Sequence, residues 1–574
     1  MDEYSMLTEE IDPLFQRKVI WKTRRPVPPK PDIGTLGKVT YEGFSYQCRY
    51  RISTFEARSS RAVLEFLEEF GSEIDWTPEQ MLEEYVPPTL EDLRFHVAGY
   101  DRPELRPSSL TSTLVDSAVL AIARAEGSNR VIDRWLEPEN LSRVRVPSKT
   151  SPGLRYRRAG FKTKKDALLT AIKDAYVDLA RMTSEGVQPE EIPCSMAGRG
   201  KLVGGEGVAS GKAAGRLIIV PDLARHLIGC LGAQPCARFV RNLSKENGGV
   251  MVGLGIFNNS WARFFRLLEG PYTYYCLDFS GFDQSLPAWV IKKAFSVIRK
   301  KFRAAPGDDE YWDHEYNRLC HTLIADPSGH LFRKHCGVGS GDPWTSLIGS
   351  YANWIILMSA CIKLGVEGPK IFTFGDDSVM ALPRGGKTPS IDQFQQVITE
   401  MFGMTIHPRK SFVTTQLYAD KDRPVEDQKP VTFLSYACNS AGLPVRSHRD
   451  VTSILLHPEW NEKDDPVYEL SRVWSLYLST YWNDKSEKFL RTLFFWLRAR
   501  RTGKGRHAWD DVRWLTKHGL PYSVLLQATF DDLPDELDII RLYSINRHDP
   551  LSKEWTEWVT EKDVGSLRVL PMSS

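Results

Sequence analysis

The chain has 574 residues, a formal net charge of +2 and 42% hydrophobic residues. This length allows about four domains of roughly 150 residues each, and the near-neutral charge by itself indicates no partner. The N-terminus lacks a basic-then-apolar leader and no apolar run approaches ~20 residues, so we expect an intracellular protein without a signal peptide or transmembrane segment. The nine cysteines show no paired spacing, which favours reduced thiols over disulfides.

A basic segment runs from residue 141 to residue 182, where Lys and Arg greatly outnumber Asp and Glu. It contains the loop Ser151-Pro152-Gly153 and then a predicted helix, whose apolar face is formed by Leu168, Ile172, Ala175, Tyr176 and Leu179. The charges fit either an ordinary solvated face or a surface that contacts a nucleic-acid phosphate backbone. The segment alone does not decide between the two.

A Gly-rich segment follows, and it ends in the predicted strand Leu217–Val220. It does not fit a P-loop, because Glu206 stands where that pattern needs Gly and Ala213 stands where it needs Ser or Thr. What remains suits either a triphosphate site or a solvated loop. The segment carries four cations: Arg199, Lys201, Lys212 and Arg216.

Two acidic segments predict a metal site. In the first, strand-like alternation ends near Asp278, and Asp283 follows five residues later. In the second, apolar runs flank Gly375, Asp376 and Asp377, which predicts a hairpin with both carboxylates at its tip. Carboxylates reached from a strand end and from a hairpin are what a two-metal phosphoryl-transfer site requires.

The chain contains an internal comparison for this hairpin. Gly307-Asp308-Asp309 repeats the tripeptide without apolar strands on both sides, so we interpret that copy as a surface turn. A nearby group of His and Cys residues, which includes His321 and His335, fits no common zinc spacing. Between His321 and His335, residues 327–329 predict a hairpin turn.

Further segments complete the pattern. A loop at Ser340-Gly341 precedes an apolar helix on which Thr345, Gly349 and Asn353 form one polar, small-residue stripe. Ser390 is predicted to cap a helix that ends at Gly403. Lys410 and a strand-turn-strand at 431–445 follow, and later a helix-like run at 486–501.

Taken together, these segments resemble the viral RNA-dependent RNA polymerases with a right-hand fold. Asp278 with Asp283, then Ser340-Gly341 with Thr345 and Asn353, then the Gly-Asp-Asp hairpin match three palm motifs in order. Among such polymerases, SPGLRYRRAGF, GRGKLV, the Gly-Asp-Asp and PVRS look most like those of small double-stranded RNA viruses, the partitiviruses and picobirnaviruses. The resemblance covers about residues 150–450.

The resemblance implies an α/β (α+β) right-hand fold with fingers, a palm with an antiparallel sheet, and a mainly helical thumb, closed by fingertips. The implied domains are an N-terminal extension with part of the fingers at 1–140, fingers at 141–270 and 291–335, palm at 271–290 and 336–445, and thumb with the C-terminal region at 446–574. It also implies virion or host-cytoplasm localisation, with RNA, NTPs and viral capsid protein as partners.

The resemblance also implies roles for single residues. Two Mg²⁺ ions, for which Mn²⁺ can substitute, are expected on Asp278, Asp376 and Asp377, with Lys410 as general acid for pyrophosphate. The four cations of the Gly-rich segment are expected to bind the triphosphate. Ribose recognition is expected from Asp283, Ser340, Gly341, Thr345 and Asn353, and template contact from Ser151, Pro152, Gly153, Arg155, Lys164 and Lys165.

Two other classes of protein are weighed against this interpretation. A reverse transcriptase shares the palm, but it would carry a bulky steric gate near position 283 and would lack a partner such as Asn353. A non-catalytic RNA-binding or capsid-associated protein has no need for Asp278, Asp376 and Asp377. RNA binding without metal-dependent synthesis would identify the second class.

Overall fold

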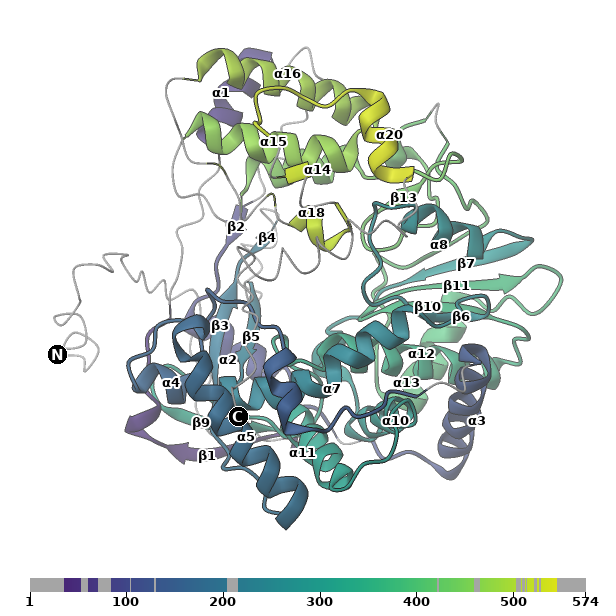
Figure 1. Ribbon diagram of the computed structural model, residues 1–574. Coiled ribbons are helices and arrows are strands. Elements are labelled where there is room, and N and C mark those ends of the chain that lie inside the picture. The colour runs from purple at the N-terminus through teal and green to yellow at the C-terminus, as the bar shows by residue number, and fades with distance from the viewer. Residues whose placement is uncertain are drawn as a thin grey trace.

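The computed structural model describes residues 36–52, 60–70, 84–103, 105–127, 131–203, 215–420, 423–458, 465–501 and, with short gaps, 507–544. These residues form a mixed helix and sheet fold, as the fold class predicts. Two five-stranded sheets and a group of C-terminal helices surround the middle of the molecule (Figure 1).

The first sheet, here called the site sheet, has the strand order β12-β7-β11-β10-β6. Strand β6 runs parallel to β10, and the other neighbours are antiparallel. Alternate residues of β7 face opposite cores: Tyr275 and Leu277 join one, Tyr274 and Cys276 the other. The sheet is therefore buried on both faces. Its strands are β6 (Gly248–Val250), β7 (Tyr272–Leu277), β10 (Lys370–Phe374), β11 (Asp377–Pro383) and β12 (Phe412–Thr414).

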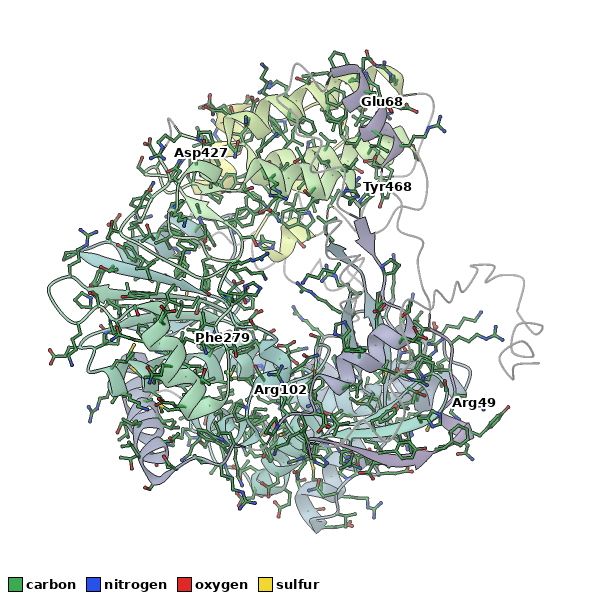
Figure 2. All side chains as sticks on the ribbon, turned by 180° about the vertical axis from the view of Figure 1, so that it is seen from behind. Arg49, Glu68, Arg102, Phe279, Asp427 and Tyr468 are labelled. Atoms are coloured by element: carbon green, nitrogen blue, oxygen red, sulfur yellow. The ribbon has the colours of Figure 1, made fainter. Side chains whose placement is uncertain are left out.

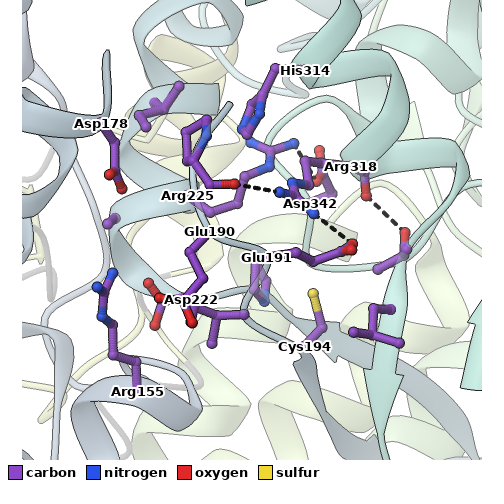
Figure 3. Close-up of a pocket in the computed structure, with 17 residues that line it drawn as sticks. Arg155, Asp178, Glu190, Glu191, Cys194, Asp222, Arg225, His314, Arg318 and Asp342 are labelled. Carbon is purple, nitrogen blue, oxygen red and sulfur yellow. Dashed lines mark hydrogen bonds and ion pairs between the residues drawn. The ribbon is translucent and has the colours of Figure 1, made fainter. Parts of the chain in front are cut away.

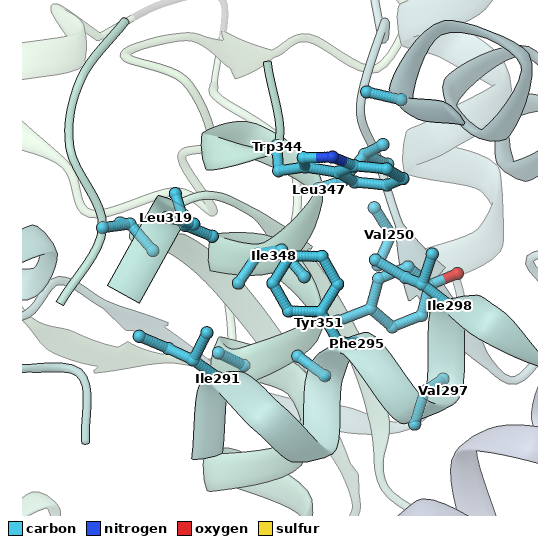
Figure 4. Close-up of a cluster of buried hydrophobic side chains, with 14 of the residues drawn as sticks. Val250, Ile291, Phe295, Val297, Ile298, Leu319, Trp344, Leu347, Ile348 and Tyr351 are labelled. Atoms are coloured by element: carbon cyan, nitrogen blue, oxygen red, sulfur yellow. The ribbon is translucent and has the colours of Figure 1, made fainter. Parts of the chain in front are cut away.

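Helix α12 (Thr345–Leu364) is the central helix of the first core. It contacts β10 and three helices, α3 (Ser109–Glu126), α10 (Ala288–Arg299) and α13 (Ile391–Phe402). Figure 4 shows Trp344 and Tyr351 packed among aliphatic side chains of this core. Among the described residues, α12 alone is long and apolar enough to cross a membrane, and 83% of that stretch is buried inside the protein.

The second sheet has the strand order β1-β9-β8-β3-β5. Helix α2 (Leu90–Ala98) packs on it through Leu93 and Val97, which join Met196 and Ile219 in a separate core. Helices α5 (Lys164–Glu185), α7 (Leu223–Arg241) and α11 (Asp308–Cys320) pack against one another in the same part of the molecule. Its strands are β1 (Val39–Phe44), β3 (Cys194–Arg199), β5 (Arg216–Val220), β8 (Leu323–Ala325) and β9 (His330–Lys334).

A C-terminal bundle covers the other face of the site sheet. It contains α14 (His448–Leu456), α15 (Pro466–Thr480), α16 (Asp484–Arg500) and α20 (Glu536–Ser544), together with α1 (Arg61–Phe70) from near the start of the chain. Phe66 of α1 packs edge-on against Phe489 and Trp496 of α16. The bundle therefore joins segments that lie more than four hundred residues apart.

Shorter elements complete the described fold: β2 (Glu84–Val86), β4 (Lys201–Val203), α4 (Leu154–Arg158), α8 (Ser260–Leu268), α9 (Phe282–Ser285), β13 (Ala437–Cys438), β14 (Pro444–Val445), α18 (Trp514–Lys517) and 3₁₀ turns at Tyr46–Cys48, Pro138–Arg143 and Val425–Asp427.

Most predicted elements are present. The hairpin β10–β11 forms, and so does the hairpin β8–β9 around residues 327–329. Ser390 accepts a hydrogen bond from the Gln393 N–H in a capping box, and Gly403 ends α13 in a left-handed conformation. The predicted strand at 217–220 and the predicted helix at 486–501 correspond to β5 and α16.

Three local predictions need correction. Tyr176 is 37% exposed and does not belong to the buried face of α5. Gly307 is the N-cap of α11, and Asp308 is buried and pairs with Arg299 at 3.1 Å, so this tripeptide begins a helix and is not a plain surface turn. The predicted strand-turn-strand at 431–445 contains only the two-residue strands β13 and β14.

Candidate active site

The hairpin brings its carboxylates beside the end of β7. Phe374 pairs with Asp377, so Gly375 and Asp376 form a two-residue turn and Asp377 opens β11. Ser378 pairs with Leu277 of β7. Because the neighbouring residues of an antiparallel pair also face each other, Asp278 lies next to Asp377. The three acids gather at one end of the site sheet, although only Asp376 stands at the hairpin tip.

Helix α12 holds the turn in place. The Nδ2 atom of Asn353 donates to the carbonyl oxygens of Gly375 at 2.9 Å and Asp376 at 3.1 Å. The N–H of Gly375 donates to Ser350 Oγ at 2.8 Å. The predicted stripe does face the site, since a Cβ built on Gly349 would lie 3.6 Å from the Cα of Gly375. Sequence reasoning missed Ser350, although a small polar residue in an apolar helix is a usable signal.

Burial and nearby negative charge raise the pKa of two of these carboxylates, Asp376 and Asp377. Burial, together with the charges of Asp376 and Asp278, raises the pKa of Asp377 to about 7. Burial also raises the pKa of Asp376. Asp278 has a cationic partner, because Lys410 Nζ lies 2.9 Å from its Oδ2. A positive charge between these acids would therefore be stabilised.

Asp283 lies on the short helix α9 that follows β7. Ser340 Oγ donates to Asp283 Oδ2 at 3.1 Å, so the predicted loop and the predicted acid do meet. Burial raises the pKa of Asp283 to about 6, with a further contribution from Asp376. Thr345 Oγ1 donates to the Gly339 carbonyl at 2.5 Å, which ties the same loop to the start of α12.

The loop is also pressed against β5. Gly341 has φ +114°, and a Cβ there would lie 2.4 Å from the carbonyl oxygen of Ile219. The Ile219 N–H donates to the Ser340 carbonyl at 2.8 Å. Glycine is therefore required at position 341 by both conformation and space.

Two cations of the Gly-rich segment, Lys201 and Arg216, lie near the acids. Arg199 and Arg216 are opposite each other in the β3–β5 pair. Arg216 lies close enough to Asp376 and Asp283 to lower the pKa of both. Burial lowers the pKa of Lys201 on β4, and the neighbouring charges of Lys410 and Arg216 lower it further. Lys212 lies outside the described residues.

A cavity of about 1210 Å³ opens between the second sheet and the C-terminal bundle. Ser151 and Lys164 line it as predicted, and burial lowers the pKa of Lys164 to about 8. Pro152 and Gly153 are buried behind it, and Lys165 is exposed on α5. Lys149 and Arg157 of the basic segment and Arg199 of the Gly-rich segment also line it. Four further polar or basic residues of the wall were not predicted: Arg446, His457, Arg472 and Trp514.

One known protein family matches more than half of the chain. The family model described as viral RNA-dependent RNA polymerase matches residues 139–498. The chain belongs to this family. The match includes every acid, cation and loop described above.

The matched relatives of the chain have low sequence identity to it. The chain is 24% identical to the genome polyprotein of Lettuce mosaic virus strain E over 325 residues, which are 56% of the chain and 9% of that polyprotein. It is 21% identical to the genome polyprotein of Plum pox potyvirus strain El amar over 255 residues, or 43% of the chain and 16% of that polyprotein. The matches thus span a small part of these polyproteins.

A small cavity of about 40 Å³ is lined in part by Asp342, the residue after Gly341 (Figure 3). The template candidate Arg155 lines this cavity beside Asp178 and Asp222, not the large one. Here Arg225 of α7 pairs with Glu315 at 2.9 Å and with Asp342 at 3.1 Å. Since Asp342 directly follows Gly341, Arg225 anchors the Ser340 loop, a role that no sequence pattern indicated.

The donor set suits a divalent cation that also binds phosphate oxygens. Within the described ranges, no three His, Cys, Asp or Glu side chains converge closely enough to hold an ion by themselves. Mg²⁺ is typically bound by one or two carboxylates, water and substrate phosphates, so such a cage is not needed. The raised pKa values of Asp376 and Asp377 show that negative charge is destabilised at these positions, and a bound cation would offset this.

Proposed function

We propose that the chain is a viral RNA-dependent RNA polymerase that extends an RNA 3′ end from NTPs on an RNA template. The observation that carries the proposal is the placement of Asp278 beside Asp377 and Asp376, with Arg216 and Lys201 facing them. Acids that hold metal and cations that hold triphosphate are the two parts that nucleotidyl transfer requires.

Each group of residues has a proposed task. Arg216 and Lys201, with Arg199 and Lys212, hold the incoming triphosphate by charge-assisted hydrogen bonds. Asp283, positioned by Ser340, accepts a hydrogen bond from a ribose hydroxyl. Asn353 has a second task besides holding the turn, because its Oδ1 is buried without a hydrogen-bond partner among the described residues and can accept from the 2′-hydroxyl.

Asp278, Asp376 and Asp377 would hold two Mg²⁺ ions, for which Mn²⁺ can substitute. When bound, the ions lower the pKa of the 3′-hydroxyl and stabilise charge at the α-phosphate. Lys410 forms an ion pair with Asp278, and its side chain is 59% exposed. In this proposal it turns toward the departing pyrophosphate and donates a proton.

The right-hand description follows from the same proposal. The site sheet and α12 act as the palm, the second sheet and its helices as the fingers with Arg199–Arg216 at the fingertips, and the C-terminal bundle as the thumb. The cavity of about 1210 Å³ between fingers and thumb guides the template, since its wall carries Lys149, Arg157 and Lys164.

We further propose a double-stranded, segmented genome like those of partitiviruses and picobirnaviruses, with action inside a capsid or in the host cytoplasm. SPGLRYRRAGF, GRGKLV and PVRS support this group. The relatives named above come from other viruses, so genome type, capsid contact and localisation rest on these segments alone.

Nucleotide incorporation on a short single-stranded RNA with Mg²⁺ tests the proposal, with NTPs and dNTPs offered in parallel. Wild type should extend with NTPs, and Asp376→Ala should lose at least about a thousand-fold in rate while it still binds RNA. Asp309→Ala is the matched control, because Asp309 lies in the second Gly-Asp-Asp copy and is 76% exposed. It should behave as wild type.

Two results would contradict the proposal. Extension with dNTPs at the same rate as NTPs would favour a reverse transcriptase. RNA binding by wild type with no product under any template or metal condition would favour a binding protein that retains the acids without using them.

A further inference from the structure

We propose that an exposed aromatic and arginine cluster beside the large cavity is a stacking platform for single-stranded RNA. The cluster consists of Phe44, Tyr46 and Arg49 and is called the aromatic platform below. This inference rests on the proposed function and extends it, because the platform would hold template nucleotides before they enter the cavity.

The surface chemistry of the platform suits unpaired bases. Phe44 is 49% exposed and Tyr46 is 70% exposed, although apolar rings of this size are normally covered. The Arg49 guanidinium lies 4.7 Å from the Tyr46 ring centroid and 5.4 Å from that of Phe44. Aromatic faces and arginine planes together are what single-stranded nucleic acid stacks on, and the arginine also attracts phosphate.

The backbone under the platform is fixed. The Ser45 N–H donates to the Gly329 carbonyl at 2.9 Å, and Arg49 Nε donates to the Ser328 carbonyl at 3.3 Å. Next to it, the hydroxyl of Tyr50 donates to the Ala325 carbonyl at 2.8 Å and accepts from the Met196 N–H at 2.6 Å. A surface held to two strands and a turn loses little entropy when it binds a ligand.

The platform neighbours residues of the cavity wall. Two residues beyond Arg49, Arg51 lines the cavity of about 1210 Å³, and so does Arg157 of α4. Gln47 accepts a hydrogen bond from Arg158 at 3.5 Å, which places the platform beside α4. Figure 2 places Arg49 at the outer edge of this part of the molecule, on the solvent side.

The local charge favours RNA over a protein partner. Residues 41–52 contain one acid, Glu42, and it is paired with Arg333 at 3.1 Å. The exposed residues next to the platform include Arg51, Arg157 and Arg158. An apolar partner would not require these cations, whereas a phosphate backbone would. The platform also lies outside residues 139–498, the part that matches the polymerase family.

Fluorescence anisotropy with two RNAs, oligouridylates of about 6 and about 20 nucleotides, tests the platform, since sites of this kind cover roughly 4–16 nucleotides. All proteins carry Asp376→Ala so that no synthesis occurs. Tyr46→Ala should weaken binding of the longer RNA about 10-fold, because stacking is worth about 1–3 kcal/mol per base. Tyr46→Ala should leave the affinity for the shorter RNA unchanged. Tyr46→Phe should bind the longer RNA as tightly as the parent does.

The control is Tyr176→Ala, which removes an exposed tyrosine from α5 and should bind both RNAs as its parent does. A double-stranded RNA of about 20 base pairs should bind the parent and Tyr46→Ala equally well, because paired bases do not expose their faces. Unchanged affinity of Tyr46→Ala for the longer RNA, or an equal loss for both lengths or for the duplex, overturns the platform. Because binding is measured without synthesis, failure of the polymerase proposal remains a separate result.

Discussion

The structure changes the expected role of Asn353 more than that of any other candidate site residue. Its position in the polar stripe suggests ribose recognition alone, yet its amide nitrogen is used to hold the Gly375-Asp376 turn. Replacing it would disturb the position of Asp376 as well as the proposed sugar contact. Asp283 is the better residue for isolating sugar selection, because its side chain is held only by Ser340 among the hydrogen bonds described.

Asp283→Ala should reduce the preference for an NTP over the matching dNTP by about 10-fold or more, since a hydrogen bond to a charged group is worth about 1.5–3 kcal/mol. The ratio of kcat/KM for the two nucleotides measures this. Ser340→Ala leaves the carboxylate in place and should have a smaller effect. An unchanged ratio in Asp283→Ala would rule out its role in ribose recognition.

Asp222 predicts a pH effect on stability away from the site. It is 3% exposed, and burial raises its pKa to about 7. Because the carboxyl pKa is higher in the folded chain than in the unfolded chain, protonation favours the folded state at low pH. This contribution to the free energy of unfolding, at most about 4 kcal/mol, is lost as pH rises through about 7. Asp222→Asn should therefore gain stability relative to wild type between pH 5 and pH 8. Urea unfolding at each pH measures the difference, and a constant difference would contradict the prediction.

At the scale of elements, the β10–β11 hairpin depends on one backbone conformation. Gly375 has φ +61°, in the left-handed region, and a Cβ there would meet no atom within 4 Å. A substitution would therefore act through the backbone and not through a clash. Any loss of activity would therefore result from a shift of the Asp376 and Asp377 carboxylates.

Gly375→Ala should cost about 1 kcal/mol of stability and should reduce polymerase activity much more than stability, because the turn carries Asp376. Gly385→Ala is the matched control: Gly385 has φ +92°, equally open surroundings and a place in the loop after β11. Thermal unfolding and nucleotide incorporation, measured for both variants, separate the two effects. Equal activity in the two variants would show that the turn conformation is unimportant.

At the scale of the whole molecule, separate cores hold the parts together. One core surrounds α12, and a second joins the site sheet to the C-terminal bundle and to α1. The second core includes Phe66, which packs against Phe489 and Trp496. An N-terminal helix thus stabilises the C-terminal part.

Phe66→Ala should lower the free energy of unfolding of this part by about 3–5 kcal/mol, because a fully buried ring is replaced by a cavity. Phe495→Ala removes a ring that is 42% exposed on α16 and should cost far less. Thermal and urea unfolding followed by tryptophan fluorescence compare the two. Similar costs for both variants would mean that α1 does not support the bundle.

The residue order along the chain determined the chemistry of this protein. Asp278, Asp283, the Ser340 loop, Asn353 and the Gly375 turn were predictable because each depends on neighbours within a few residues, through strand alternation, helix period or turn chemistry. The same reasoning predicted the ends of α13 and the strand β5.

Only the tertiary structure decided which residues from distant segments meet. The pairing of Lys410 with Asp278, the anchoring of the Ser340 loop by Arg225, and the position of Arg155 at the small cavity all join parts far apart in sequence. The aromatic platform lies against the β8–β9 turn, because β1 pairs with β9 and the Ser45 N–H donates to the Gly329 carbonyl. Such contacts depend on packing across cores, which local periodicity does not encode.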